Sequence, residues 1–146
     1  MKDYNALQEI IDQVVGKIGV KKTIDLMTSF INNTSVKHTE PEKIRLLTQY
    51  VIGTAIREFE LKEELFFFSS IREYRDARMC CFHLLRKYTQ DTLPKIGLSF
   101  QCSERTVEYG CGKVTERLAV PQGNTRFVAN YAAIETRLLE FIGKVN

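Results

Sequence analysis

The sequence contains few residues that interrupt helices, with 8 glycines and 3 prolines among its 146 residues. Between them, apolar side chains recur at spacings of three and four rather than in alternation, which is the period of amphipathic helices. Hydrophobic residues make up 44% of the chain and charged residues 27%, a composition typical of a globular protein. The sequence therefore predicts an all-α fold, a multi-helix bundle.

Long apolar runs are also lacking. No stretch approaches the roughly 18 residues that cross a bilayer, and the first residues, Lys2 to Asn5, do not begin the apolar core of a signal peptide. We therefore expect a cytoplasmic protein without a membrane partner.

Cysteine is sparse and does not follow a disulfide or metal pattern. The neighbours Cys80 and Cys81 cannot easily bridge to each other, and Cys102 and Cys111 complete the set of four. Together with His83 the pair is the sharpest candidate for a metal site, but no CxxC and no second ligand pair at zinc-finger spacing accompanies it. The sequence therefore favours buried, reduced thiols, with neither a metal nor a cofactor.

Signatures of catalysis are missing as well. The sequence has no GxxxxGK[ST] phosphate loop. Its two histidines, His38 and His83, have no carboxylate or nucleophile at a recognisable spacing. We therefore expect a binding protein rather than an enzyme, and infer no small-molecule substrate.

Positive charge lies in the second half of the chain. Residues 1–70 carry 9 basic and 10 acidic side chains, whereas residues 71–146 carry 12 and 8. The net charge of +3 is too small to indicate a nucleic-acid partner by itself. A nucleic-acid surface, if present, is expected in the second half.

The helical periods divide the chain into a first part, residues 1–68, and a second part, residues 69–146. In the first part, helices are expected to end at Gly19 and near Phe59, with Thr39 capping the third and a short amphipathic piece over residues 61–68. We expect residues 1–68 to complete the core, to bind another protein or to form the contact of a homodimer. In the second part, the expected caps are Ser69 or Ser70, then Thr92 and Ser103.

The window from Leu93 to Tyr109 has the pattern of a helix-turn-helix. Gly97 is small enough to let two helices approach closely, and Gln101 stands where a left-handed glycine is usual. The apolar residues expected to pack around the turn are Ile96, Phe100, Cys102 and Val107. Many helical hairpins share such spacing, so the pattern alone is only moderately specific.

More residues extend this pattern on both sides. A long helix ends in Leu85, Arg86, Lys87 and Thr89, and the next one begins Thr92, Leu93, Pro94, Lys95, Ile96 and Gly97. Phe100 precedes the turn, and Val107, Cys111, Lys113 and Val114 follow it. Over roughly residues 72–118 the chain resembles the C-terminal duplex-DNA-binding domain of the bacterial replication initiator DnaA, a Trp-repressor-like helical domain.

The resemblance has two departures. The family's Asp-His-Thr-Thr-Val string is shortened here to Glu104, Arg105, Thr106 and Val107, and the family's ATPase module has no counterpart. The resemblance therefore implies duplex-DNA binding at this surface, without the initiator's recognition sequence or its ATPase.

The candidate DNA-binding residues follow from the motif and from charge. Arg105 is expected to read guanine edges, and Ser103 or Thr106 to reach a phosphate or a thymine methyl. The candidate phosphate contacts are Arg72, Arg75, Arg78, Lys95 and Lys113. From spacing alone, the three arginines equally suit a solvated face paired with Glu73 and Asp76.

The sequence thus predicts a protein that binds double-stranded DNA, with full or partial sequence specificity, in replication control, mobile-element maintenance or transcription regulation. Glu104 and Glu108 repel phosphates, and they favour the alternative of a helical protein-interaction module that kept the fold without binding DNA.

Overall fold

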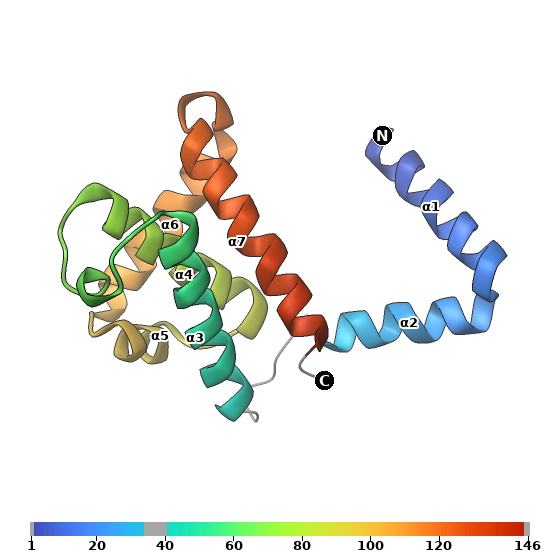
Figure 1. The fold of residues 1–146 in the computed structure, drawn as a ribbon, viewed down its shortest axis with the longest axis horizontal. Coiled ribbons are helices and arrows are strands. Elements are labelled where there is room, and N and C mark those ends of the chain that lie inside the picture. The colour runs from blue at the N-terminus through green and yellow to red at the C-terminus, as the bar shows by residue number, and fades with distance from the viewer. Residues whose placement is uncertain (1, 34–40, 145–146) are drawn as a thin grey trace. The chain divides into compact units, whose positions relative to one another are not determined.

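The computed structural model describes residues 2–33 and 41–144, which form helices joined by short turns and contain no strand (Figure 1). The α-helices are α1 (Lys2–Ile18), α2 (Val20–Asn33), α3 (Pro41–Glu58), α4 (Arg72–Thr89), α5 (Leu93–Phe100), α6 (Glu104–Ala119) and α7 (Thr125–Lys144). Two short 3-10 helices, η1 (Glu63–Leu65) and η2 (Pro121–Gly123), lie between them. The predicted all-α fold is confirmed. No helix in the described ranges is long and apolar enough to span a membrane.

The chain forms two compact units, residues 1–33 and residues 34–146. Helix α3 packs against α4 and α7 in the second unit, where its buried face carries Leu47, Val51 and Ala55. The division into compact units falls before α3, because the apolar stripe of α3 joins the core of the later helices. The functional division into residues 1–68 and 69–146 stays a prediction.

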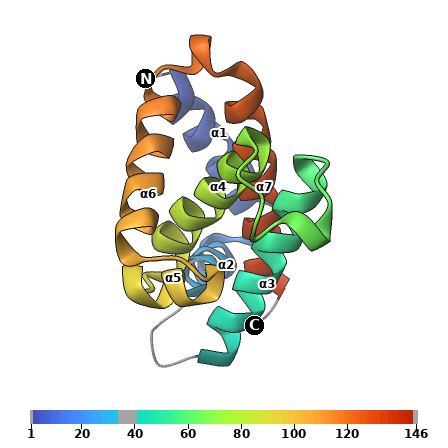
Figure 2. The same ribbon diagram turned by 90° about the vertical axis from the view of Figure 1, so that its left-hand side faces the viewer.

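Helix α4 is the centre of the second unit. It contacts α3, α5, α6 and α7, and Figure 2 shows it running between them. Small side chains such as Ala77 and Cys80 let neighbouring helices approach it, and larger ones such as Phe82 and Leu84 fill the core. This arrangement fixes α6 against α4, and these two helices carry most of the predicted DNA contacts.

Three local expectations need correction or fall outside the structure. Residues 61–68 form only η1, because Phe66 turns into the core and ends the local helical stripe. The N-cap of α4 is Ile71, which makes no side-chain cap, rather than Ser69 or Ser70; Ser69 Oγ accepts from the Ile71 amide at 3.2 Å. The expected cap at Thr39 lies outside the described residues.

The first unit consists of α1 and α2, which meet at Gly19 and diverge from it (Figure 1). Gly19 has a φ of +88°, the left-handed conformation in which glycine ends a helix without strain, as the sequence predicted. Helix α1 contains no buried residue. In α2 the Thr23 side chain is buried, and its hydroxyl donates to the Gly19 carbonyl at 2.7 Å.

Candidate nucleic-acid interface

Helices α5 and α6 are joined by a tight turn that the predicted residues hold. Gln101 adopts the left-handed conformation (φ 57°, ψ 40°), and the Cys102 amide donates to the Gly97 carbonyl at 2.9 Å. A Cβ on Gly97 would lie 2.6 Å from the Cys102 carbonyl oxygen. Glycine is therefore needed because the backbone of the turn folds back over this position. The sequence-based expectation was instead that Gly97 lets two helices approach closely.

Both helices begin at the predicted caps. The Thr92 hydroxyl accepts from the Lys95 amide at 3.4 Å, and the Ser103 hydroxyl accepts from the Thr106 amide at 3.2 Å. The Ser103 and Thr106 hydroxyls also lie 3.0 Å apart. Since Ser103 already satisfies one amide of the first turn of α6, the remaining amides of that turn are left for a ligand or water.

Helix α6 lies directly on α4. Val107 and Val114 of α6 are completely buried, and a Cβ on Gly110 would lie 2.8 Å from the Phe82 ring of α4. Gly110 stands three residues after Val107 on the apolar face of α6, a close contact that sequence reasoning missed. The close contact brings the exposed side chains of the two helices onto one surface.

The beginning of α6 exposes a mixed set of side chains. Arg105 and Thr106 are exposed, and Arg105 forms no ion pair or hydrogen bond with the described residues. Glu104 and Glu108 are exposed on the same turns. The helix start thus offers one unpaired cation and two carboxylates.

The three arginines of α4 have different surroundings. Arg75 is exposed and has no partner within the described ranges, whereas Arg72 Nε lies 3.7 Å from Asp76. Arg78 is half-buried and donates to the carbonyls of Phe66 and Ser69 at 2.7 and 2.9 Å. Arg78 therefore holds the segment before α4 in place and has fewer donors left for a phosphate than Arg75.

Two adjoining hollows connect α4 with α6, and Arg75, Met79 and Tyr109 line both. One hollow, of about 320 Å³, also includes Arg78 and Thr106. The other, of about 430 Å³, includes Arg72 and Lys113. We call the surface formed by Arg72, Arg75, Arg78, Thr106, Tyr109 and Lys113 the α4–α6 face; it brings together five of the eight predicted site residues.

The other three predicted residues lie elsewhere. Ser103 and Arg105 stand at the beginning of α6, next to Thr106 in the chain, and line neither hollow. Lys95 lines a separate hollow between α3 and α5, with Ile52 and Leu98. No hydrogen bond or ion pair links Lys95 to the α4–α6 face among the described residues.

Tyr109 is a residue of this face that sequence reasoning missed. Its side chain is 63% exposed, and Lys113 Nζ lies 5.7 Å from its ring centroid while pairing with Glu116 at 3.4 Å. The signal was its spacing, three residues after Thr106 and four before Lys113, which places all three on one side of α6.

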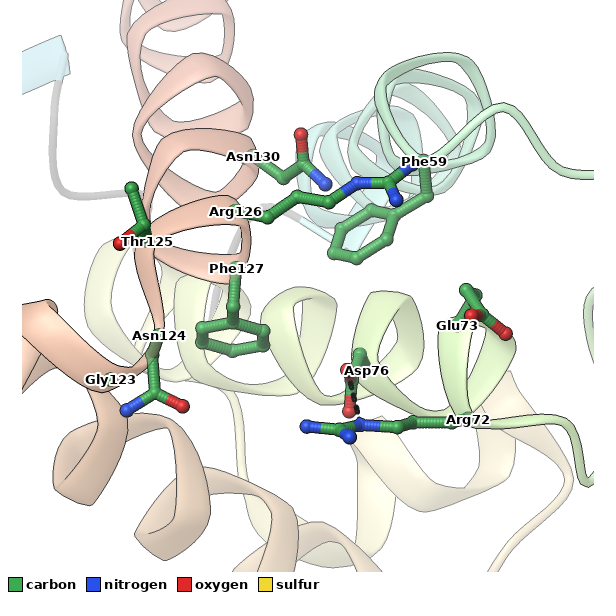
Figure 3. A pocket seen from close by; sticks show the side chains of 10 residues that line it. All are labelled: Phe59, Arg72, Glu73, Asp76, Gly123, Asn124, Thr125, Arg126, Phe127 and Asn130. Atoms are coloured by element: carbon green, nitrogen blue, oxygen red, sulfur yellow. Dashed lines mark ion pairs between the residues drawn. The ribbon is translucent and has the colours of Figure 1, made fainter.

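An ionic contact supports the face from below. Arg117 of α6 donates to Asp76 of α4 at 2.8 Å, and its guanidinium lies 4.8 Å from the Phe127 ring centroid of α7. Figure 3 shows the Asp76 side chain over the guanidinium of Arg72, with their ion pair drawn as a dashed line and Phe127 to one side, in a hollow of about 260 Å³. Arg117 thus links α6 to both α4 and α7, and the Asp76 carboxylate partly neutralises Arg72.

The cysteine and histidine candidates form no ligand set. Cys80 and Cys81 are buried, and burial raises the pKa of both thiols, which keeps them protonated. His83 Nδ1 lies 2.7 Å from the Tyr131 hydroxyl. Within residues 2–33 and 41–144, no group of three or more potential ligands is placed to hold a metal. His38 lies outside these ranges.

Comparison with known proteins gives one informative relative. The chain is 28% identical, over 112 residues, to the chromosomal replication initiator protein DnaA of Synechocystis sp. (strain ATCC 27184 / PCC 6803 / Kazusa). The match covers 75% of this chain and 25% of the relative, so the chain spans about a quarter of that initiator's length. No family model matches, and no solved structure matches. The chain is therefore similar to a part of a DnaA initiator.

Proposed function

We propose that the protein binds double-stranded DNA through a helix-turn-helix formed by α5 and α6, with α6 as the recognition helix, rather than acting as an enzyme. The observation that carries this proposal is the α4–α6 face, where the unpaired Arg75 stands beside the exposed side of α6. Similarity to a part of a replication initiator supports it.

The division of labour follows from where each side chain lies. Arg105 projects from the first turn of α6, the part of a recognition helix that meets base edges in the major groove. Thr106 and the free amides of that turn are suited to a phosphate. Arg75, with Arg72 and Lys113 beside it, is suited to clamp the backbone of one strand.

The two exposed carboxylates set the expected strength of binding. Glu104 and Glu108 lie on the first turns of α6 and repel phosphates unless one accepts from a cytosine amine. The carboxylates therefore weaken binding. Because arginine and lysine contacts to phosphates supply the affinity, we propose binding that depends strongly on salt. We propose that it acts in replication control, mobile-element maintenance or transcription regulation. A phosphate contact of Lys95, which lies outside the α4–α6 face, stays a prediction.

A titration of mixed-sequence duplex DNA at several salt concentrations tests the proposal. With about three phosphates neutralised, the logarithm of the binding constant should fall with a slope of about −3 against the logarithm of salt. Affinity should then fall about 50-fold between 50 and 200 mM salt.

A matched pair of variants locates the binding. Arg75→Ala on the proposed face should reduce the salt slope by about one unit, whereas Arg57→Ala on the exposed side of α3 should leave it unchanged. Lack of binding at low salt to any pool of random duplex would overturn the proposal and leave the interaction module.

A further inference from the structure

The first unit exposes far more apolar surface than a stable pair of helices can. Nine large apolar side chains of α1 and α2 are between 40% and 65% exposed: Tyr4, Leu7, Ile10, Ile18, Val20, Ile24, Leu26, Met27 and Phe30. Two short helices without a buried core are marginal in water, because burial of an apolar face supplies most helical stability. The unit therefore needs another apolar surface to cover it.

The amount of surface fits one partner of similar size. Side chains of these types expose about 100 Å² each at such fractions, so the nine offer on the order of 1,000 Å² per copy. Stable interfaces bury about 800 Å² on each side. Both helices must contribute to reach this area.

The spacing on α1 indicates what the partner is. Tyr4, Leu7, Ile11, Val14 and Ile18 recur at intervals of three, four, three and four, the spacing of a coiled-coil seam over two heptads. The first two and the last are exposed, and Ile11 and Val14 between them are half-buried. Reading the seam backwards gives nearly the same spacing. Two copies of α1 running in opposite directions would therefore align Tyr4 with Ile18, Leu7 with Val14, and Ile11 with itself.

The charges beside this seam agree with an antiparallel pair. Asp3 precedes Tyr4 and Lys17 precedes Ile18, so both flank the same edge of the seam at opposite ends of α1. In the antiparallel alignment each Asp3 faces Lys17 of the other copy, and the two-fold axis makes this contact twice. A parallel pair would instead place like charges at the same end.

We propose that two copies of this chain associate through α1 and α2, with α1 antiparallel to α1 of the partner and Asp3 paired with the partner's Lys17. This inference does not depend on DNA binding. It assigns the first unit the role of a dimerisation module.

Sedimentation of the full chain over a range of concentrations tests the proposal. The wild-type protein should form a dimer, and Leu7→Glu should shift it to a monomer. Leu98→Glu is the matched control, because Leu98 is 80% exposed but lies on α5 in the second unit. A monomeric wild-type protein at 100 μM, on the order of typical working concentrations for weak complexes, would overturn the proposal.

A charge exchange separates loss of the interface from loss of the fold. Asp3→Lys and Lys17→Asp should each weaken the homodimer about tenfold, because two attractive pairs become repulsive. An equimolar mixture of the two variants should restore dimers of wild-type strength, as should the double variant on its own. Failure of both combinations to restore the dimer would overturn the antiparallel arrangement.

Discussion

Two glycines of the second unit are required by close contacts rather than by a left-handed backbone conformation. Gly97 and Gly110 lie inside α5 and α6, where glycine weakens a helix by about 1 kcal/mol relative to alanine. Each occupies a place where a Cβ would come within 3 Å of a neighbour: a backbone carbonyl at Gly97 and the Phe82 ring at Gly110. Gly112, also in α6, has no neighbour within 4 Å.

This contrast gives a matched prediction for stability. Gly97→Ala should destabilise the protein by about 1 to 3 kcal/mol, because the Cys102 carbonyl is backbone and cannot move aside. Gly112→Ala should be neutral or stabilising by up to about 1 kcal/mol, since it gains helix propensity in open space. Urea unfolding of the two variants measures both changes. Equal free energies of unfolding for the two variants would show that the Cys102 carbonyl leaves room for a Cβ at residue 97.

Arg75 and Arg105 are both unpaired, but we propose different roles for them. If Arg105 contacts a guanine edge, Arg105→Ala should reduce affinity for the preferred site by about 1 to 3 kcal/mol and leave random DNA almost unaffected. Arg75→Ala should weaken binding to every duplex alike, because a phosphate carries no sequence information. Selection from random duplexes, followed by titration of both variants, measures the difference.

The same selection can exclude this assignment. An Arg105→Ala protein that selects the parent's sequence shows that Arg105 does not read bases. The shortened start of α6, one residue less than in the resembled family, would then have turned Arg105 away from the groove. Thr106 and Tyr109, farther along the exposed side of α6, would be the next residues to test.

At the scale of elements, a polar contact joins α4 to α7. His83 and Tyr131 are linked at 2.7 Å, with their rings edge to face at 5.4 Å. Burial lowers the pKa of His83, and the nearby Lys87 lowers it further, while Glu135 acts in the opposite direction. The folded state therefore favours neutral His83.

This shift predicts how stability depends on pH. The unfolded chain takes up a proton at His83 near the ordinary pKa of 6.5, whereas the folded chain does so only at lower pH. The His83 contribution is therefore complete above pH 6.5 and is lost as the pH falls towards the lower, folded-state pKa. Urea unfolding at pH 7 and pH 5.5 should show a smaller loss of stability in His83→Gln than in the wild type. His38 is present in both proteins, so its contribution cancels.

Most helices of the fold could be predicted from the sequence because their signals are local. Apolar spacing and the caps at Thr92 and Ser103 gave α5 and α6, and Gly19 gave the end of α1. The expectation of a short amphipathic piece over residues 61–68 was wrong, because Phe66 is positioned by contacts in the core and not by its neighbours in the chain. Local spacing likewise does not show that α3 packs against α4 and α7, because these are long-range contacts.

The candidate site could be predicted only in part. Charge and motif identified Arg75 and Thr106, which lie on one surface. The sequence alone could not show that Arg78 donates hydrogen bonds to the Phe66 and Ser69 carbonyls, because it identifies charged residues but not their partners. Tyr109 was missed because its spacing to Thr106 and Lys113 shows only that the three share one side of α6. That this side adjoins Arg75 depends on the packing of α6 against α4.

At the scale of the whole molecule, the two units divide the proposed tasks. The helices of the first unit expose large apolar side chains, and the second unit contains the described core and the α4–α6 face. A single helix-turn-helix contacts few base pairs, and association of two copies doubles the contacts with DNA. Dimerisation through the first unit would therefore strengthen binding without any change to the DNA-contacting residues.

The last prediction joins both proposals and concerns DNA with one or two preferred sites. A dimer should bind a duplex with two suitably spaced sites at least about 100-fold more tightly than a duplex with one, because the second contact becomes intramolecular. Leu7→Glu should remove this advantage while leaving affinity for the single site unchanged, since Leu7 lies in α1 and the α4–α6 face is intact. Anisotropy titrations over a series of spacings measure both quantities. Equal loss on one site and two sites would mean that the first unit contacts DNA itself, and an undiminished two-site advantage would mean that the copies meet through another surface.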